Sequence, residues 1–130
     1  MSECTIKITT SVDGAESYFS SRADIGRNGK DGYTVKYIYD GDECTMQIGD
    51  DAVVQMRRGS LNMDASFISD RSTVLSIDDE DGRADVPVIC KKVSCECFRR
   101  GIFCSLEYAI EPSEFVVRIV ILTNFDLKSL

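Results

Sequence analysis

The feature of this 130-residue sequence that most constrains its fold is the spacing of its turns. All nine glycines fall where the chain would need to reverse, and the segments between them are short and alternate apolar with polar residues. Alternation with a period of two is typical of strands with one buried face, and turns at this spacing are typical of antiparallel hairpins rather than βαβ units. The pattern predicts an all-β protein that needs no helix longer than a turn or two.

Ten strands follow from these turns, and the dipeptide Asp13-Gly14 is the strongest hairpin signal among them. The expected strands are 4–12, 16–25, 33–39, 43–48, 52–57, 61–67, 72–77, 84–98, 102–110 and 115–122. A glycine-rich mobile loop is expected at 26–32. Because closure removes sheet edges, we expect an up-and-down antiparallel meander that closes into a β-barrel of about 8 to 10 strands. A two-sheet sandwich is the alternative, with its crossings at 26–32 and 78–83.

The last three strands carry the clearest facial pattern. In 102–110 the even positions are the apolar set, and in 84–98 the odd positions near the turn are, so both sets are expected to face inward. A two-residue turn at 100–101, or a four-residue turn at 99–102, joins them on this reasoning. The predicted cross-strand pairs are Cys97 with Cys104, Cys95 with Leu106, and Val93 with Tyr108.

The final run, 115–122, is apolar on both faces apart from Arg118. A strand of this kind is usually buried on both sides, so its outer face needs a cover. The 123–130 tail, the N-terminal residues or a second copy of the protein could supply it. A homodimer contact through this strand is therefore one expectation.

The length and net charge of the chain limit its possible functions. The length fits one domain, a single β-barrel over residues 1–130. A net charge of −7, with basic doublets scattered along the chain, argues against binding nucleic acid or anionic membranes. No apolar run reaches the ~18 residues of a membrane span, and residues 1–5 lack the features of a signal peptide. We expect a cytoplasmic protein whose six cysteines are reduced thiols.

Catalytic and metal chemistry find little support. The sequence has no histidine, which excludes Ser-His-Asp and Cys-His nucleophile pairs and His-rich zinc sites. The cysteine group Cys90, Cys95, Cys97 and Cys104 is expected to pack, because Cys-x-Cys on a strand places sulfurs about 7 Å apart. Oxidation in air could join Cys97 to Cys104. The acidic loop 78–81 fails as an EF-hand, and 26–32 matches no phosphate-binding motif. No catalytic residue, metal or cofactor is expected.

The inward aromatic and sulfur-containing side chains, with one arginine, instead suggest a ligand site in the barrel lumen. Such a lining is apolar with a few polar tips, as ligand pockets commonly are. The competing interpretation is that these side chains simply fill the barrel. The candidates are Tyr33, Tyr37, Met56, Met63, Phe67, Tyr108 and Arg118. Two hypotheses follow: a non-enzymatic barrel that binds a small apolar or amphiphilic molecule, or a filled barrel that contacts a partner through 115–122.

The order of strands and the central stretch 53–67 resemble the central hairpin of the YwiB-like family of bacterial β-barrels. The resemblance runs from the opening strand through Gly32-Tyr33 to Leu106-Glu107-Tyr108. Family members have a Tyr-x-Thr-Pro-Phe-Gly-like segment after the sixth strand, where this chain has 72–77 and the acidic loop, so a function tied to that segment is not carried over. The resemblance implies a lipocalin-like (calycin-like) barrel in a bacterial protein of unknown function, with no catalytic residues to transfer. Calycins often hold small apolar molecules, but a shared fold does not establish a shared function.

Overall fold

Short alternating segments become strands throughout the computed structural model, which describes residues 2–111 and 116–124. All ten predicted strands are present within these residues, and they contain no helix. The strands are β1 (Ser2–Val12), β2 (Ala15–Asn28), β3 (Gly32–Tyr39), β4 (Asp42–Ile48), β5 (Ala52–Arg58), β6 (Asn62–Ile68), β7 (Arg71–Asp79), β8 (Gly82–Phe98), β9 (Gly101–Ile110) and β10 (Val116–Asn124).

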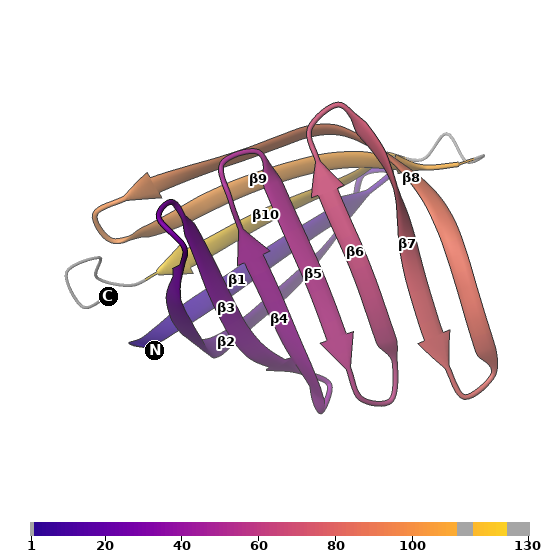
Figure 1. Ribbon diagram of the computed structural model, residues 1–130, viewed down its shortest axis with the longest axis horizontal. Coiled ribbons are helices and arrows are strands. Elements are labelled where there is room, and N and C mark those ends of the chain that lie inside the picture. Colours follow the sequence, from indigo (N-terminus) through magenta and orange to yellow (C-terminus); the bar gives the residue numbers. More distant parts are fainter. Residues whose placement is uncertain (1, 112–115, 125–130) are drawn as a thin grey trace.

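Each strand pairs antiparallel with the next along the chain, and β1 pairs with β10 to close the ring. The predicted closed up-and-down barrel is therefore confirmed, with ten strands, and the sandwich alternative is wrong. In Figure 1, β3–β7 run steeply across the view whereas β9, β10 and β1 follow its long axis, so the front and back walls cross. Phe115 and the 125–130 tail, which were expected to contribute to or cover the last strand, lie outside the described residues.

The expected long loop at 26–32 is wrong. β2 continues to Asn28 and pairs with β3 as far as Gly32, which leaves a turn of three residues, 29–31. The glycines at 26 and 32 belong to strands because each is paired in the ladder, Gly26 with Thr34 and Gly32 with Asn28. Glycine content alone therefore overestimated the length of this connection.

The predicted β8–β9 register is also wrong, by two residues. Cys95 lies opposite Cys104, Cys97 opposite Ile102, and the two-residue turn is Arg99-Arg100. A shift of two keeps the same faces inward, so the apolar alternation could not distinguish the registers. Gly101 belongs to β9 because its backbone approaches β10 closely: a Cβ there would lie 2.2 Å from the carbonyl oxygen of Thr123.

A β-bulge keeps the apolar side chains of the long strand β8 on the inner face on both sides of the bulge. The register shifts between Cys90 and Lys92, so the inward positions change from even to odd numbers. Ser69, in the β6–β7 turn, braces this point. Its hydroxyl donates to the carbonyl of Val93 (3.1 Å) and accepts from the amide of Val93 (2.9 Å).

Two ladders of the barrel wall are short. β2 and β3 pair only from Ala23–Tyr37 to Asn28–Gly32, and β6 and β7 pair over three residues each, from Asn62–Asp78 to Asp64–Ser76. The first half of β2 therefore pairs with β1 alone among the described strands. The β2–β3 ladder stops at Ala23–Tyr37, and the candidate site lies beside the seam that begins there.

Candidate ligand-binding site

The lumen is filled by side chains at one end and hollow at the other. The hollow end is the one where the β1–β2, β3–β4 and β5–β6 hairpins turn, and it contains a cavity of about 290 Å³. Its aliphatic lining consists of Ile8, Met56, Met63 and Ile119. Its aromatic lining consists of Phe19, Tyr37 and Tyr39, and the exposed Tyr18 borders it from the outer face of β2. The remaining residues are polar, namely Thr10, Ser17, Cys44, Gln55 and Arg57.

The closed end contains three of the predicted site residues. Tyr33, Phe67 and Tyr108 are 7%, 1% and 8% exposed, and they belong to the continuous apolar core. The rings of Phe67 and Tyr108 lie 4.8 Å apart, centroid to centroid. Burial raises the pKa of the Tyr108 hydroxyl, which stays neutral. These three side chains fill the barrel, as the competing interpretation of the sequence expected.

Aromatic rings bridge the seam where the β2–β3 backbone ladder stops. The ring of Phe19 on β2 lies 5.8 Å from that of Tyr37 and 4.9 Å from that of Tyr39, both on β3. Tilted ring pairs at these distances attract one another. Burial raises the pKa of Tyr37, so this hydroxyl remains a neutral hydrogen-bonding group beside the cavity. A second hollow of about 430 Å³ shares Tyr37 and Cys44 with the first and lies along the same seam.

Of the described residues that line the 290 Å³ cavity, Arg57 is the one that carries a charge. Its side chain is 16% exposed, and its Nε donates to Oδ2 of Asp42 over 2.7 Å. Its guanidinium carbon lies 4.9 Å from the centre of the Tyr39 ring, a favourable position for a cation over an aromatic face. Two different contacts thus hold the guanidinium in one orientation.

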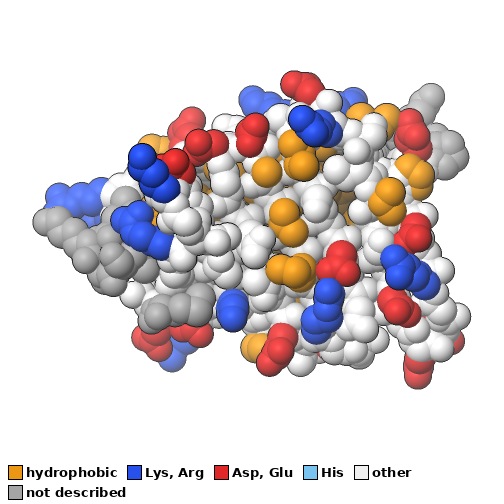
Figure 2. Space-filling view, viewed as in Figure 1, with side chains coloured by type: hydrophobic (Ala, Val, Ile, Leu, Met, Phe, Trp, Pro, Cys, Tyr) orange, Lys and Arg blue, Asp and Glu red, His pale blue; other side chains and the backbone are white. Residues whose placement is uncertain are grey.

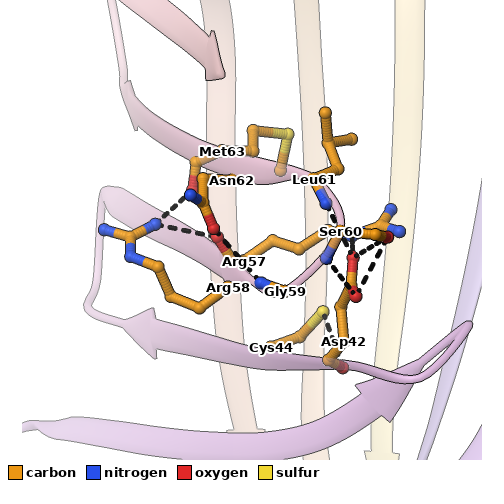
Figure 3. A network of polar contacts seen from close by, with 9 residues as sticks. All are labelled: Asp42, Cys44, Arg57, Arg58, Gly59, Ser60, Leu61, Asn62 and Met63. Atoms are coloured by element: carbon orange, nitrogen blue, oxygen red, sulfur yellow. Dashed lines mark hydrogen bonds and ion pairs between the residues drawn. The ribbon is translucent and has the colours of Figure 1, made fainter. Parts of the chain in front are cut away.

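Asp42 ties this arginine to the β5–β6 turn (Figure 3). Besides Arg57, its buried carboxylate accepts hydrogen bonds from the Ser60 amide (2.8 Å), the Ser60 hydroxyl and the Leu61 amide (3.3 Å). The Ser60 amide, followed by Arg57, lowers the pKa of Asp42 to about 2. Gly59 makes the approach possible, because a Cβ there would lie 2.0 Å from Oδ1 of Asp42.

The predicted site residues therefore do not all lie together. Tyr37 and Met63 line the cavity, whereas Tyr33, Phe67 and Tyr108 fill the closed end. Met56 borders the cavity but has the parity of the outer face of β5. Arg118 was a candidate for the lumen, and the structure corrects this. Its side chain is 69% exposed on the outer face and lies 3.7 Å from the Glu107 carboxylate, because the inward positions of β10 are odd-numbered.

Ten of the thirteen lining residues were missed, among them Arg57, Tyr39 and Phe19, and so was Asp42. Arg57 could have been found, because it has the same parity as the inward Val53 on its strand. Tyr39 could also have been found, because it has the same parity as the candidates Tyr33 and Tyr37 on its strand. By contrast, the contact between Phe19 and the β3 tyrosines, and the clamp on Asp42, join residues 15 to 20 positions apart through tertiary structure.

The cysteines are thiols in this structure. Cys95 lies directly opposite Cys104, not Cys97, so the expected pairing of Cys97 with Cys104 is wrong. The neighbouring Cys95 thiol, with burial, raises the pKa of Cys104. Within residues 2–111 and 116–124, no three His, Cys, Asp or Glu side chains are grouped as metal ligands. Nor does any helix among these residues have the length and apolarity to cross a membrane.

The fold and the site define a closed ten-stranded antiparallel barrel with one filled end and one hollow end. The structure is similar to the crystal structure of the YwiB protein from Bacillus subtilis, with a TM-score of 0.81. The match covers 95% of this chain and 91% of that one at 14% sequence identity. The resemblance to YwiB-like barrels is thus confirmed at the level of the fold. No family model matches the sequence, and no curated protein matches it.

Proposed function

We propose that this protein is a non-enzymatic barrel that binds a small, partly apolar molecule in the hollow end of its lumen. The observation that carries the proposal is the cavity itself. Small barrels are often filled by side chains, and this one is filled only at one end. The volume of about 290 Å³ is close to the lower limit of roughly 300 Å³ for ligand pockets, so the ligand is small.

The composition of the wall supports binding. Aliphatic and aromatic side chains make up the apolar part, and a few hydroxyl, amide and guanidinium groups provide polar contacts. This combination gives affinity through apolar burial and orientation through polar groups. We expect a ligand to enter beside the seam between β2 and β3, because ring contacts and not backbone hydrogen bonds close the wall there.

The site favours binding over catalysis. Asp42 contacts the lining residue Arg57, and its four donors hold it ionised, which makes it a poor proton carrier near neutral pH. Cys44 lines the cavity, but burial raises its pKa, so it is a poor nucleophile. A catalytic group needs a matched acid or base, and histidine is absent from the chain.

A matched pair of tryptophan variants tests the proposal with the neutral fluorescent probe N-phenyl-1-naphthylamine. Thr10 lines the cavity, and its neighbour Thr9 lies on the opposite face of β1. Thr10→Trp should weaken probe binding at least tenfold by occupying the cavity, and Thr9→Trp should leave it within twofold. Two results would contradict the proposal: the wild type fails to bind the probe, or both variants weaken saturable binding equally. Native mass spectrometry of the purified protein adds a direct search for a retained small molecule.

The outer face of the last strands supports a second candidate function, contact with another copy of the protein. Leu122 on β10 and Phe103 on β9 lie opposite each other on the outer face, 41% and 40% exposed. The face in Figure 2, formed by β3–β7, instead shows scattered charges of both signs with separate apolar islands. If β10 forms a homodimer contact, sedimentation should give a dimer that Leu122→Lys converts to a monomer. A monomeric wild type at high concentration would exclude it.

A further inference from the structure

We propose that the lumen cavity selects a small carboxylate with an aromatic body, and that the free edge of the Arg57 guanidinium binds the carboxylate. This inference rests on the proposed binding function and specifies the chemistry of the ligand. It follows from the charge of the cavity wall, the orientation of Arg57 and the arrangement of the aromatic rings.

The charge of the cavity wall favours an anionic ligand. The whole chain carries a net charge of −7, yet among residues 2–111 and 116–124 no acidic side chain lines this cavity, and Arg57 contributes a single positive charge. The neighbouring 430 Å³ hollow differs, because its walls include both acidic and basic residues, among them Glu3, Asp24, Arg22 and Lys36. A cation at the edge of a partly dehydrated lumen favours an anionic ligand over a neutral or cationic one.

The orientation of the Arg57 guanidinium favours a planar anion, such as a carboxylate, as the ligand. Its Nε is occupied by Asp42, and its face lies against the Tyr39 ring. Among the hydrogen bonds of residues 2–111 and 116–124, none uses Nη1 or Nη2 of Arg57. These two nitrogens form the end of the fork that binds a carboxylate through two parallel hydrogen bonds.

Asp42 forms an ion pair with this cation, but Arg57 engages only one edge of the carboxylate, and three further donors contact it. The Ser60 amide, the Ser60 hydroxyl and the Leu61 amide satisfy the carboxylate from the side of the turn. Asp42 is therefore a positioning residue: it fixes the Nε side of Arg57 and leaves the opposite edge for the ligand. Arg58, the next residue, also pairs with an aspartate, Asp64, but it lies exposed on the outer face, away from the cavity.

The aromatic rings in the cavity wall favour a ligand whose apolar part is also aromatic. Phe19, Tyr37 and Tyr39 form one wall of the cavity, and Ile8, Met63 and Ile119 supply flat apolar surface elsewhere. Aromatic walls favour stacked or edge-to-face contact with an aromatic ligand. The volume of about 290 Å³ limits the body to one or two fused rings.

The test compares two fluorescent probes of the same shape, naphthalene-2-carboxylate and 2-naphthylmethanol, by titration at pH 7. The wild type should bind the carboxylate about tenfold more tightly than the alcohol, because a charge-assisted pair is lost in the alcohol. Arg57→Gln should weaken carboxylate binding about tenfold and change alcohol binding less than twofold. Arg57→Lys keeps the charge without the fork and should give an intermediate loss. Arg58→Gln is the matched control and should bind both probes like the wild type.

The outcomes separate this inference from the proposed function. Equal binding of both probes by the wild type overturns the inference and leaves the binding barrel standing. The same holds if Arg57→Gln, folded by circular dichroism, weakens both probes alike, because Arg57 would then act only on the structure. If neither probe binds the wild type, both proposals fail. The comparison of the two probes on the wild type tests the inference even if the variants fail to fold.

Discussion

Replacing one phenylalanine by alanine at each end of the barrel should show that one end provides stability and the other provides binding. Phe67 lies in the closed end, 1% exposed, with its ring 4.8 Å from that of Tyr108. Phe19 lies at the hollow end, half-buried, and contacts two tyrosines across the β2–β3 seam. If the two ends have the roles inferred from the structure, Phe67→Ala should damage the fold and Phe19→Ala should damage the binding site.

The expected magnitudes follow from burial. Phe67→Ala removes a fully buried ring and leaves a void in a close-packed core, which typically costs about 3–5 kcal/mol in the free energy of unfolding. Phe19→Ala removes two ring contacts of roughly 0.5–1.5 kcal/mol each from a half-buried site, so we expect a loss of about 1–2 kcal/mol. Phe103→Ala, on the outer face and 40% exposed, serves as a control, with an expected loss of about 1 kcal/mol or less.

Urea unfolding followed by circular dichroism measures the stabilities, and titration with N-phenyl-1-naphthylamine measures binding. Phe19→Ala should weaken probe binding about tenfold, because a stacking contact of about 1.4 kcal/mol is lost. Phe67→Ala should leave binding within about twofold under conditions where the protein is folded. The division of the lumen into a filled end and a binding end would be refuted by the reverse pattern. In that pattern, Phe67→Ala would lower the free energy of unfolding by less than about 1.5 kcal/mol but strongly weaken probe binding.

Three further predictions address the polar contacts and the thiols. The folded pKa of Asp42, about 2, lies below its ordinary value of 3.8, so the stability it provides is present above pH 4 and is lost as the pH falls toward 2. Asp42→Asn should lower the melting temperature at pH 7 and flatten its dependence on pH in that window; an unchanged pH profile would contradict this. Ser69→Ala removes both hydrogen bonds to Val93 and should cost about 2 kcal/mol in urea unfolding, whereas the exposed Ser72→Ala should cost under about 0.5. Brief alkylation should label the exposed Cys97 before the buried Cys104, and a mild thiol oxidant should join Cys95 to Cys104; peptide mapping that finds a Cys97–Cys104 bond would reject the observed register.

The sequence alone was sufficient for the class of fold. The period-two alternation and the regular turns predicted ten antiparallel strands and a closed barrel, because both are local consequences of strand geometry and turn chemistry. The inward faces of β9 and of the tyrosine strand β3 were also predictable, since burial follows the parity of the apolar residues. These features depend on neighbours in the sequence and need no knowledge of how distant strands meet.

Tertiary structure decided the rest. Alternation is unchanged by a shift of two residues, so only the close approach of Gly101 to Thr123 and the bulge at Cys90–Lys92 fixed the β8–β9 register. The parity of β10, which sends Arg118 outward, was hidden because both faces of that strand are apolar.

The site itself depends on where the barrel is filled and where it is hollow. That division arises because β2 extends past its ladder with β3, so rings rather than backbone hydrogen bonds close the wall there. The arginine of the lumen is Arg57 because Asp42 and the β5–β6 turn meet across 18 residues of chain to hold it. Such contacts are set by the closure of the whole barrel, whereas the sequence determines only the strands from which the barrel is built.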